Sequence, residues 1–152
     1  MSLIYLDVCC LNRPFDDLTQ ERIRLEAEAV LLIIERCQSG RLNLLGSEAL
    51  DFEIARIADV VRRQKVLSLI SLAASRIQIS EEIASRARDL QEYGFHPLDS
   101  LHLACAEAGN ADIFLTTDDR LLRRAIRNRD ILRVTSANPV LWLMETTDDG
   151  DF

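Results

Sequence analysis

Four acidic side chains stand where the local pattern otherwise calls for apolar or turn residues. They are Asp7, Glu53, Asp99 and Asp118. Carboxylates brought into one crevice repel one another and raise each other's pKa values unless a divalent cation neutralises them. A donor set made only of oxygen atoms suits Mg²⁺ or Mn²⁺ rather than zinc. If the fold gathers these four residues, the chemistry they predict is that of a hard divalent metal centre.

Asp7 and Asp118 each follow a short apolar run of the kind that forms a buried strand. Leu3-Ile4-Tyr5-Leu6 precedes Asp7, and Ile113-Phe114-Leu115, with two threonines after it, precedes Asp118. In open parallel sheets, ligands bind at the carboxyl ends of the strands. The pattern therefore places both acids at the edge of the sheet where sites form.

Glu53 and Asp99 lie on predicted helices, within apolar faces. At about 100° per residue, Glu53 falls inside the arc that holds Leu50 and Ile54. Asp99 lies in a helix that begins near Pro97 and is apolar almost all round. An unpaired carboxylate on a core-facing stripe is costly. Each acid has an ordinary alternative: Glu53 as a buried acid saturated by partners, and Asp99 as a first-turn acid favoured by the helix dipole.

The elements that must position these acids alternate between strand and helix along the chain. We predict strands at 3–6, 42–45, 113–115 and 131–134, with a weaker candidate at 76–79. We predict helices at 20–39, for about ten residues after Ser47, at 60–74, 80–93, 97–109 and 118–127, and a closing turn at 139–144. This order predicts an α/β fold, a three-layer α/β/α sandwich around a mostly parallel sheet of four to five strands.

The bulk composition fits one ordered domain. At 152 residues the chain can bury a full core, and we assign 1–145 to that domain and 146–152 to an acidic flexible tail. The longest apolar run is far below the roughly 18 residues that a membrane span needs. Four cysteines without CxxC spacing are read as reduced thiols. We therefore expect a cytoplasmic protein with no membrane contact.

The net charge of −7 argues against broad electrostatic capture of nucleic acid. Contact with a phosphate backbone would need a local basic patch. Arg120, Arg123, Arg124 and Arg127 share one face of the helix after Asp118 and could form it. An ordinary solvated helix face is the alternative. Arg13, in the loop after Asp7, is a second candidate for a phosphate contact.

Several short strings together resemble the PIN-domain family over about residues 3 to 143. They are Tyr5-Leu6-Asp7, the Ser47 and Glu53 pair, Pro97-Leu98-Asp99-Ser100-Leu101-His102-Leu103-Ala104 and Thr116-Thr117-Asp118. The chain departs from the family where Val8-Cys9-Cys10 replaces the hydroxyl residue and Asn that many members carry after the first Asp. For the last acid we favour Asp118 over Asp119, which is a secondary candidate or a first-turn helix acid.

The resemblance implies a Mg²⁺- or Mn²⁺-dependent ribonuclease of the VapC-toxin kind. The four acids would hold one or two ions and support hydrolysis that leaves a 5′-phosphate and a 3′-hydroxyl. We hypothesise that Asp7 and Asp99 bind a metal ion directly. Glu53 would share that ion or position the water, and Asp118 would bind a second ion or act through water. RNA, an antitoxin protein and a second copy of the chain are the implied partners.

Two other classes stay open at this point. A PIN-like domain that has lost cleavage could serve as a binding or regulatory module. An acid-cluster phosphotransfer enzyme fits less well, because no second acid stands close to Asp7 and no suitable Lys follows a late strand. His102 could touch substrate, but a lone His on an apolar helix is more often a hydrogen-bonded core residue.

Overall fold

The computed structural model describes residues 2–148, in which five parallel strands form one sheet. The strands are β1 (Leu3–Leu6), β2 (Asn43–Ser47), β3 (Ser75–Ile77), β4 (Ile113–Leu115) and β5 (Thr135–Ala137). Their order across the sheet is β3-β2-β1-β4-β5. In register, Ile4 pairs with Leu44 on one side and with Ile113 on the other. The predicted α/β sandwich around a parallel sheet is confirmed.

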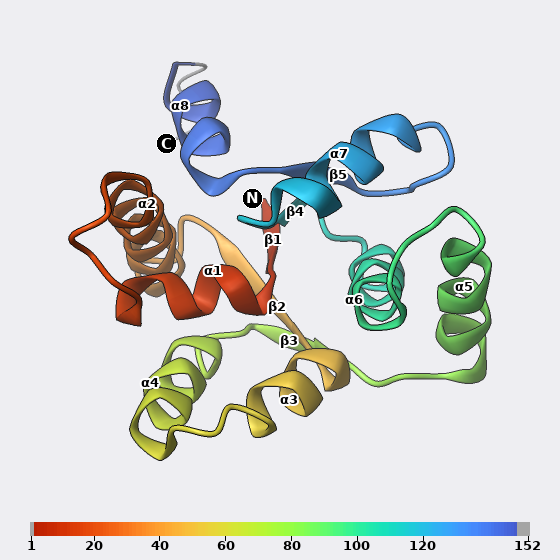
Figure 1. Cartoon of the computed structure of the whole chain (residues 1–152), viewed down its shortest axis with the longest axis horizontal. Helices are drawn as coiled ribbons and strands as arrows, with labels where there is room; N and C mark the ends of the chain where they lie inside the picture. Colours follow the sequence, from red (N-terminus) through yellow and green to blue (C-terminus); the bar gives the residue numbers. More distant parts are fainter. Residues whose placement is uncertain (1, 149–152) are drawn as a thin grey trace.

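Helices cover both faces of this sheet (Figure 1). They are α1 (Val8–Asn12), α2 (Glu21–Gln38), α3 (Glu48–Ala55), α4 (Val60–Ile70), α5 (Glu81–Gln91), α6 (Pro97–Ala108), α7 (Asp119–Arg127) and α8 (Pro139–Asp148), with a short 3₁₀ turn at Arg13–Phe15. Helices α2 and α8 lie on one side and α5 and α6 on the other, while α3 and α4 lie together at one end. The three layers follow from parallel strands, each of which needs a crossover helix to reach the next.

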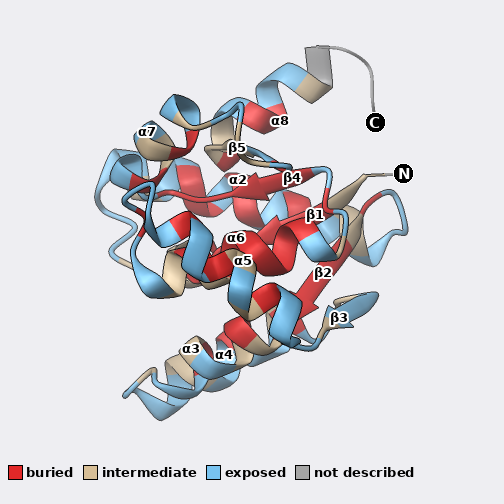
Figure 2. Cartoon of the chain, turned by 90° about the vertical axis from the view of Figure 1, so that its right-hand side faces the viewer, coloured by how far each residue is buried: buried red, intermediate tan, exposed pale blue. Residues whose placement is uncertain are grey.

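The three central strands form the core. Figure 2 shows β1, β2 and β4 buried and β3 largely exposed at one edge. Ile4, Tyr5 and Leu6 are fully buried, and the Tyr5 ring stacks on Phe114 at a centroid distance of 5.3 Å. The chain leaves β1 toward β2 on one side and later returns to β4 on the other, so the strand order reverses between β1 and β4. Ligands bind at the carboxyl ends of strands beside such a reversal, and Asp7 lies there.

The prediction of a strand at 131–134 is wrong: those residues form the turn after α7, and β5 follows at Thr135–Ala137. The apolar residues of the turn pack against the core, with Val134 buried. An edge strand of three residues that pairs only with β4 does not need an apolar run of its own. The helix Val8–Asn12 was not predicted; Asp7 caps it.

The carboxyl-terminal helix is longer than the sequence suggested. Helix α8 continues through residues 146–148, so these belong to the helix, while the rest of the predicted tail, 149–152, lies outside the described residues. In the part of the chain that the structure describes, no helix is both long and apolar enough to cross a bilayer. All four cysteines are free thiols.

Candidate metal centre

Asp7 is a buried carboxylate at the carboxyl end of the central strand. As the N-cap of α1, its Oδ1 accepts a hydrogen bond from the backbone N–H of Val8 at 2.9 Å. Its Oδ2 accepts from the hydroxyl of Thr116 at 2.9 Å, and the Cys9 thiol lies 3.5 Å from the same oxygen. All of these donors are neutral. Burial raises the pKa of Asp7, which means that the surrounding protein does not fully compensate its negative charge.

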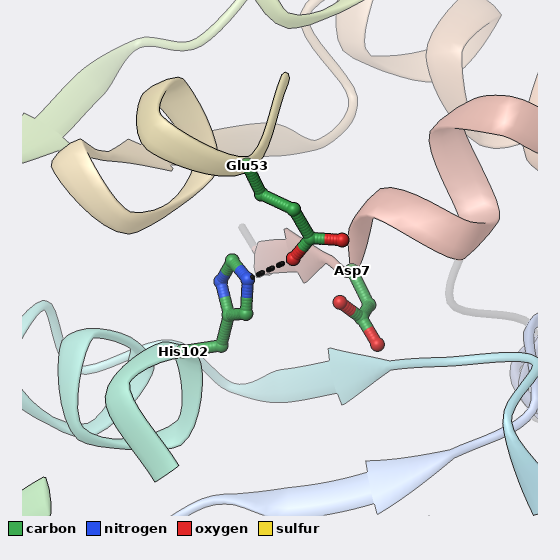
Figure 3. A group of neighbouring side chains, drawn as sticks. All are labelled: Asp7, Glu53 and His102. Atoms are coloured by element: carbon green, nitrogen blue, oxygen red, sulfur yellow. Dashed lines mark hydrogen bonds and ion pairs between the residues drawn. The ribbon is translucent and has the colours of Figure 1, made fainter. Parts of the chain in front are cut away.

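Glu53 reaches Asp7 from the last turn of α3. The Ser47 hydroxyl caps that helix by accepting from the Leu50 N–H at 3.0 Å, which fixes where α3 begins. Figure 3 shows the Glu53 side chain extending toward Asp7, with His102 beside both. One ligand atom from each of Asp7, Glu53 and His102 lies within 4.8 Å of the other two. The fold therefore brings together two of the predicted acids and a histidine.

His102 is fully buried on α6 and hydrogen-bonded at both ring nitrogens. Nε2 lies 2.7 Å from Glu53 Oε1, and Nδ1 lies 2.7 Å from the Tyr5 hydroxyl. That hydroxyl in turn lies 2.7 Å from Ser47 Oγ. The expectation of a hydrogen-bonded core histidine is confirmed, but its partner is one of the predicted site residues. Sequence reasoning overlooked Tyr5, although a phenol in a buried strand signals that its hydroxyl needs a partner.

Asp99 lies in the first turn of α6, a helix that begins at Pro97. Its pKa is raised to about 6, first by burial and then by the negative charges of Asp7 and Asp118. The negative charges of both acids therefore act on Asp99. Like charges held together in this way favour a bound proton or a bound cation.

Asp118 caps α7 rather than lying free in the loop. Its Oδ1 accepts from the backbone N–H groups of Arg120 and Leu121 at 2.9 and 3.3 Å. Within residues 2–148, its Oδ2 accepts no hydrogen bond and stays available for a ligand. Asp118 and Asp99 line the same cavity, of about 480 Å³.

Much of the lining of this cavity is basic. Besides Phe95, His96 and Leu121, it is lined by Arg120, Arg123, Arg124 and Arg127. These are the arginines of the predicted stripe on α7, and they share the cavity with two of the acids. Such a cavity offers both cations for a polyanion and oxygen ligands for a metal.

Two of the predicted site residues, Arg13 and Asp119, form ion pairs with other side chains. Arg13 donates to Glu26 Oε1 at 2.8 Å and to Asp16 Oδ2 at 3.0 Å. Both oxygens of Asp119 accept from the Arg22 guanidinium at 2.8 Å, and this pairing lowers the pKa of Asp119. The structure thus gives Arg13 and Asp119 ion-pair partners away from the acid cluster.

The donor set fits a hard divalent cation. Among residues 2–148, no lysine or arginine forms an ion pair with Asp7, Glu53, Asp99 or Asp118. Burial raises the pKa of Asp7 and of Asp99, and no lysine or arginine of the described chain pairs with either to offset that cost. The free atoms are carboxylate oxygens, which Mg²⁺ and Mn²⁺ prefer.

Comparison with known proteins identifies the family. The family model of the PIN domain matches residues 4–127, and the chain belongs to this family. PIN domains are generally metal-dependent nucleases that act on phosphodiester bonds. The sequence resemblance stated above is confirmed. No curated protein matches the chain.

Two solved structures share the fold. One is FitAB bound to an IR36 DNA fragment, with 19% identity, a TM-score of 0.57, and coverage of 90% of this chain and 95% of that one. The other is VapBC2 from Rickettsia felis bound to a DNA fragment from its promoter, with 14% identity, a TM-score of 0.51, and coverage of 90% and 98%. At these identities the likeness supports the fold.

Proposed function

We propose that this protein is a Mg²⁺- or Mn²⁺-dependent endoribonuclease and the toxin of a type II toxin-antitoxin pair. One observation carries the proposal: within residues 2–148, Asp7 and Glu53 approach within 4.8 Å without a lysine or arginine paired to either, while Asp99 and Asp118 line a cavity that four arginines also line. A nuclease needs a cation site next to a surface that holds the phosphate backbone. Membership of the PIN-domain family supports the same conclusion.

The roles of the side chains follow from their places. The metal would be held by Asp7, Glu53, Asp99 and Asp118. Hydrogen bonds from the Thr116 hydroxyl and from the Val8 N–H fix the Asp7 carboxylate. When bound, the metal orients the scissile phosphate, activates water and stabilises the leaving oxygen. The α7 arginines would bind the flanking phosphates, since guanidinium groups match phosphate geometry. The expected products carry a 5′-phosphate and a 3′-hydroxyl.

The partners are part of the proposal. The two structural neighbours, FitAB and VapBC2, are each bound to DNA in their structures. By analogy, we expect an antitoxin encoded beside this chain, a homodimer, and action in the cytoplasm. The net charge of −7 makes a basic antitoxin segment the natural complement.

One observation favours a second candidate, a binding or regulatory module without cleavage. Cys9 lies 3.5 Å from Asp7 Oδ2 and 3.2 Å from Thr116 Oγ1, at the second position after the first Asp, where many family members carry Asn. A thiol is a weaker hydrogen-bond donor than an amide. The Thr116 hydroxyl already donates to this oxygen, however, which keeps the nuclease proposal ahead.

The deciding experiment incubates the purified protein with end-labelled RNA and Mn²⁺, beside the Asp99→Asn variant and a sample with EDTA. Cleavage by the wild type that is lost in both controls supports the nuclease. Tight RNA or protein binding without cleavage of any RNA would favour the binding module. Cleavage that persists in EDTA would count against a metal-dependent enzyme.

A further inference from the structure

A chain of hydrogen bonds runs through the core and ends at Glu53. It begins at the backbone N–H of Leu50, which donates to Ser47 Oγ at 3.0 Å. The next three contacts, from Ser47 to Tyr5, from Tyr5 to His102 and from His102 to Glu53, are each 2.7 Å long. Ser47, Tyr5 and His102 all have 0% exposure, so water does not compete for these contacts.

The direction of donation follows from what each group can do. An ionised Glu53 carboxylate only accepts, so His102 Nε2 must carry a proton and donate. In a neutral imidazole, Nδ1 is then an acceptor, and the Tyr5 hydroxyl donates to it. Tyr5 accepts in turn from Ser47, which accepts from the Leu50 N–H. Every buried group in this chain is satisfied in one consistent direction.

This direction separates His102 from the metal ligands. A nitrogen that carries a proton and donates it to Glu53 has no lone pair for a cation, although His102 lies within ligand distance of Asp7 and Glu53. Hard dications also prefer oxygen to imidazole. The hydrogen bond occupies Glu53 Oε1 and leaves Oε2, which accepts no hydrogen bond within residues 2–148.

We propose that His102, held by Tyr5 and Ser47, is a positioning residue that fixes Glu53 by one oxygen and presents the other to the metal. The inference rests on the proposed function, because it assigns a role within that metal centre. Outer partners of metal ligands commonly control affinity in this way, and their loss costs about 10- to 100-fold in metal binding or activity. The hydroxyl of a tyrosine in the central strand would thus tune a site that it does not touch.

Tyr5→Phe is the sharpest test, since it removes only the hydroxyl and keeps the ring that stacks on Phe114. Two matched controls exist in the chain. Tyr93→Phe removes the hydroxyl of the other tyrosine, which is exposed, and Ile4→Val perturbs the same strand without touching the hydrogen-bond chain. Calorimetric titration with Mn²⁺ should show affinity about tenfold weaker for Tyr5→Phe, with both controls near the wild type.

A second pair of variants tests His102 directly. The amide of His102→Gln can still donate to Glu53, whereas His102→Ala cannot. We expect the Ala variant to bind Mn²⁺ at least tenfold more weakly and the Gln variant to recover part of that loss. Metal-free circular dichroism and melting of each variant show that it is folded.

The Mn²⁺ spin gives a readout that separates positioning from ligation. Pulsed electron paramagnetic resonance of the Mn²⁺-loaded wild type should show no directly coordinated ¹⁴N. A directly bound nitrogen, or unchanged Mn²⁺ affinity in Tyr5→Phe, overturns the inference while leaving the nuclease intact. A wild type that binds no Mn²⁺ overturns the proposed metal centre itself, and the inference with it.

Discussion

Two buried carboxylates, Glu26 on α2 and Asp7 at the end of the central strand, have contrasting surroundings. Glu26 on α2 is 1% exposed and accepts hydrogen bonds from Arg13, Arg22 and Asn138. Asp7 is 6% exposed and, among residues 2–148, accepts only from neutral groups of Val8, Cys9 and Thr116. The described chain thus supplies arginine counterions to Glu26 but none to Asp7. Burial of an acid therefore identifies a site only when the neighbours leave its charge uncompensated.

The largest expected effect is on cleavage. Asp7→Asn keeps the shape of the side chain but removes the charge, and a bound metal contributes several kcal/mol to the transition state. We expect RNA cleavage in Mn²⁺ to fall on the order of a hundredfold or more. Asp130→Asn, which changes an exposed acid outside the site, is the matched control. Initial rates with labelled RNA measure both variants. Equal rates for Asp7→Asn and the wild type would show that the uncompensated charge of Asp7 has no role in cleavage.

The next effect is on stability and has opposite signs at the two acids. Glu26→Gln removes the buried partner of Arg13 and Arg22, which keep Asp16 and Asp119. We expect a loss of about 2 kcal/mol, the size of hydrogen bonds to a charged group. Asp7→Asn removes an uncompensated charge, so the metal-free protein should be at least as stable as the wild type. Urea unfolding in EDTA compares the two isosteric changes. A loss of similar size at Asp7 would show that its charge is already balanced.

The pH dependence of stability should expose the same uncompensated charge. The folded pKa of Asp99, about 6, lies above its ordinary value of 3.8, so the folded state binds more protons between those values. The contribution of Asp99 to the stability of the metal-free protein is then highest at the acidic end of this window and falls as pH rises through about 6. We expect a melting temperature a few degrees lower at pH 7.5 than at pH 5.

Added Mn²⁺ and the Asp99→Asn variant test the origin of this pH dependence. Mn²⁺ at pH 7.5 should raise the melting temperature, because the cation takes the place of the proton. Asp99→Asn should flatten the metal-free profile between pH 4 and pH 7 (about the window of the raised pKa). A wild-type profile that rises with pH over this range would show that the site acids are stabilised as anions by the protein itself.

The smallest effect concerns the basic wall of the cavity. Gly94 has φ +94°, and a Cβ there would collide with the guanidinium of Arg124. Gly94→Ala should therefore displace Arg124 and weaken RNA binding several-fold. The slope of the logarithm of the RNA binding constant against the logarithm of salt concentration should fall in magnitude by about one. Gly40→Ala is the control, because φ is +81° there and a Cβ would meet open space. Filter binding at several salt concentrations distinguishes a lost phosphate contact from a general loss of fold.

Much of the architecture could be predicted because local pattern and fold agree. Apolar runs gave β1 and β4, and helical periodicity gave α2 and α6. The edge strand β5 could not be found in this way, because Thr135-Ser136-Ala137 has no buried run and owes its conformation to pairing with β4. Propensity is a weak guide where tertiary pairing decides the structure.

The same distinction between local pattern and tertiary contact applies to the candidate site. Acids that interrupt an apolar pattern, such as Glu53, are visible in the sequence. Contacts between distant residues are not: Tyr5 meets Ser47 across 42 positions and His102 across 97. The partner of Arg13 was hidden for the same reason, since nothing in the sequence shows that Glu26 points toward it.

The reversal of strand order beside β1 has a mechanical consequence. Glu53 belongs to the flank built on β2, whereas Thr116 and Asp118 belong to the flank built on β4, and Asp7 lies between them. A cation held by these groups would link the two flanks across β1, in addition to the contacts of α2 with α8 and of α3 with α6. Amide hydrogens of β1 and β4 should therefore exchange more slowly with solvent when the cation is bound.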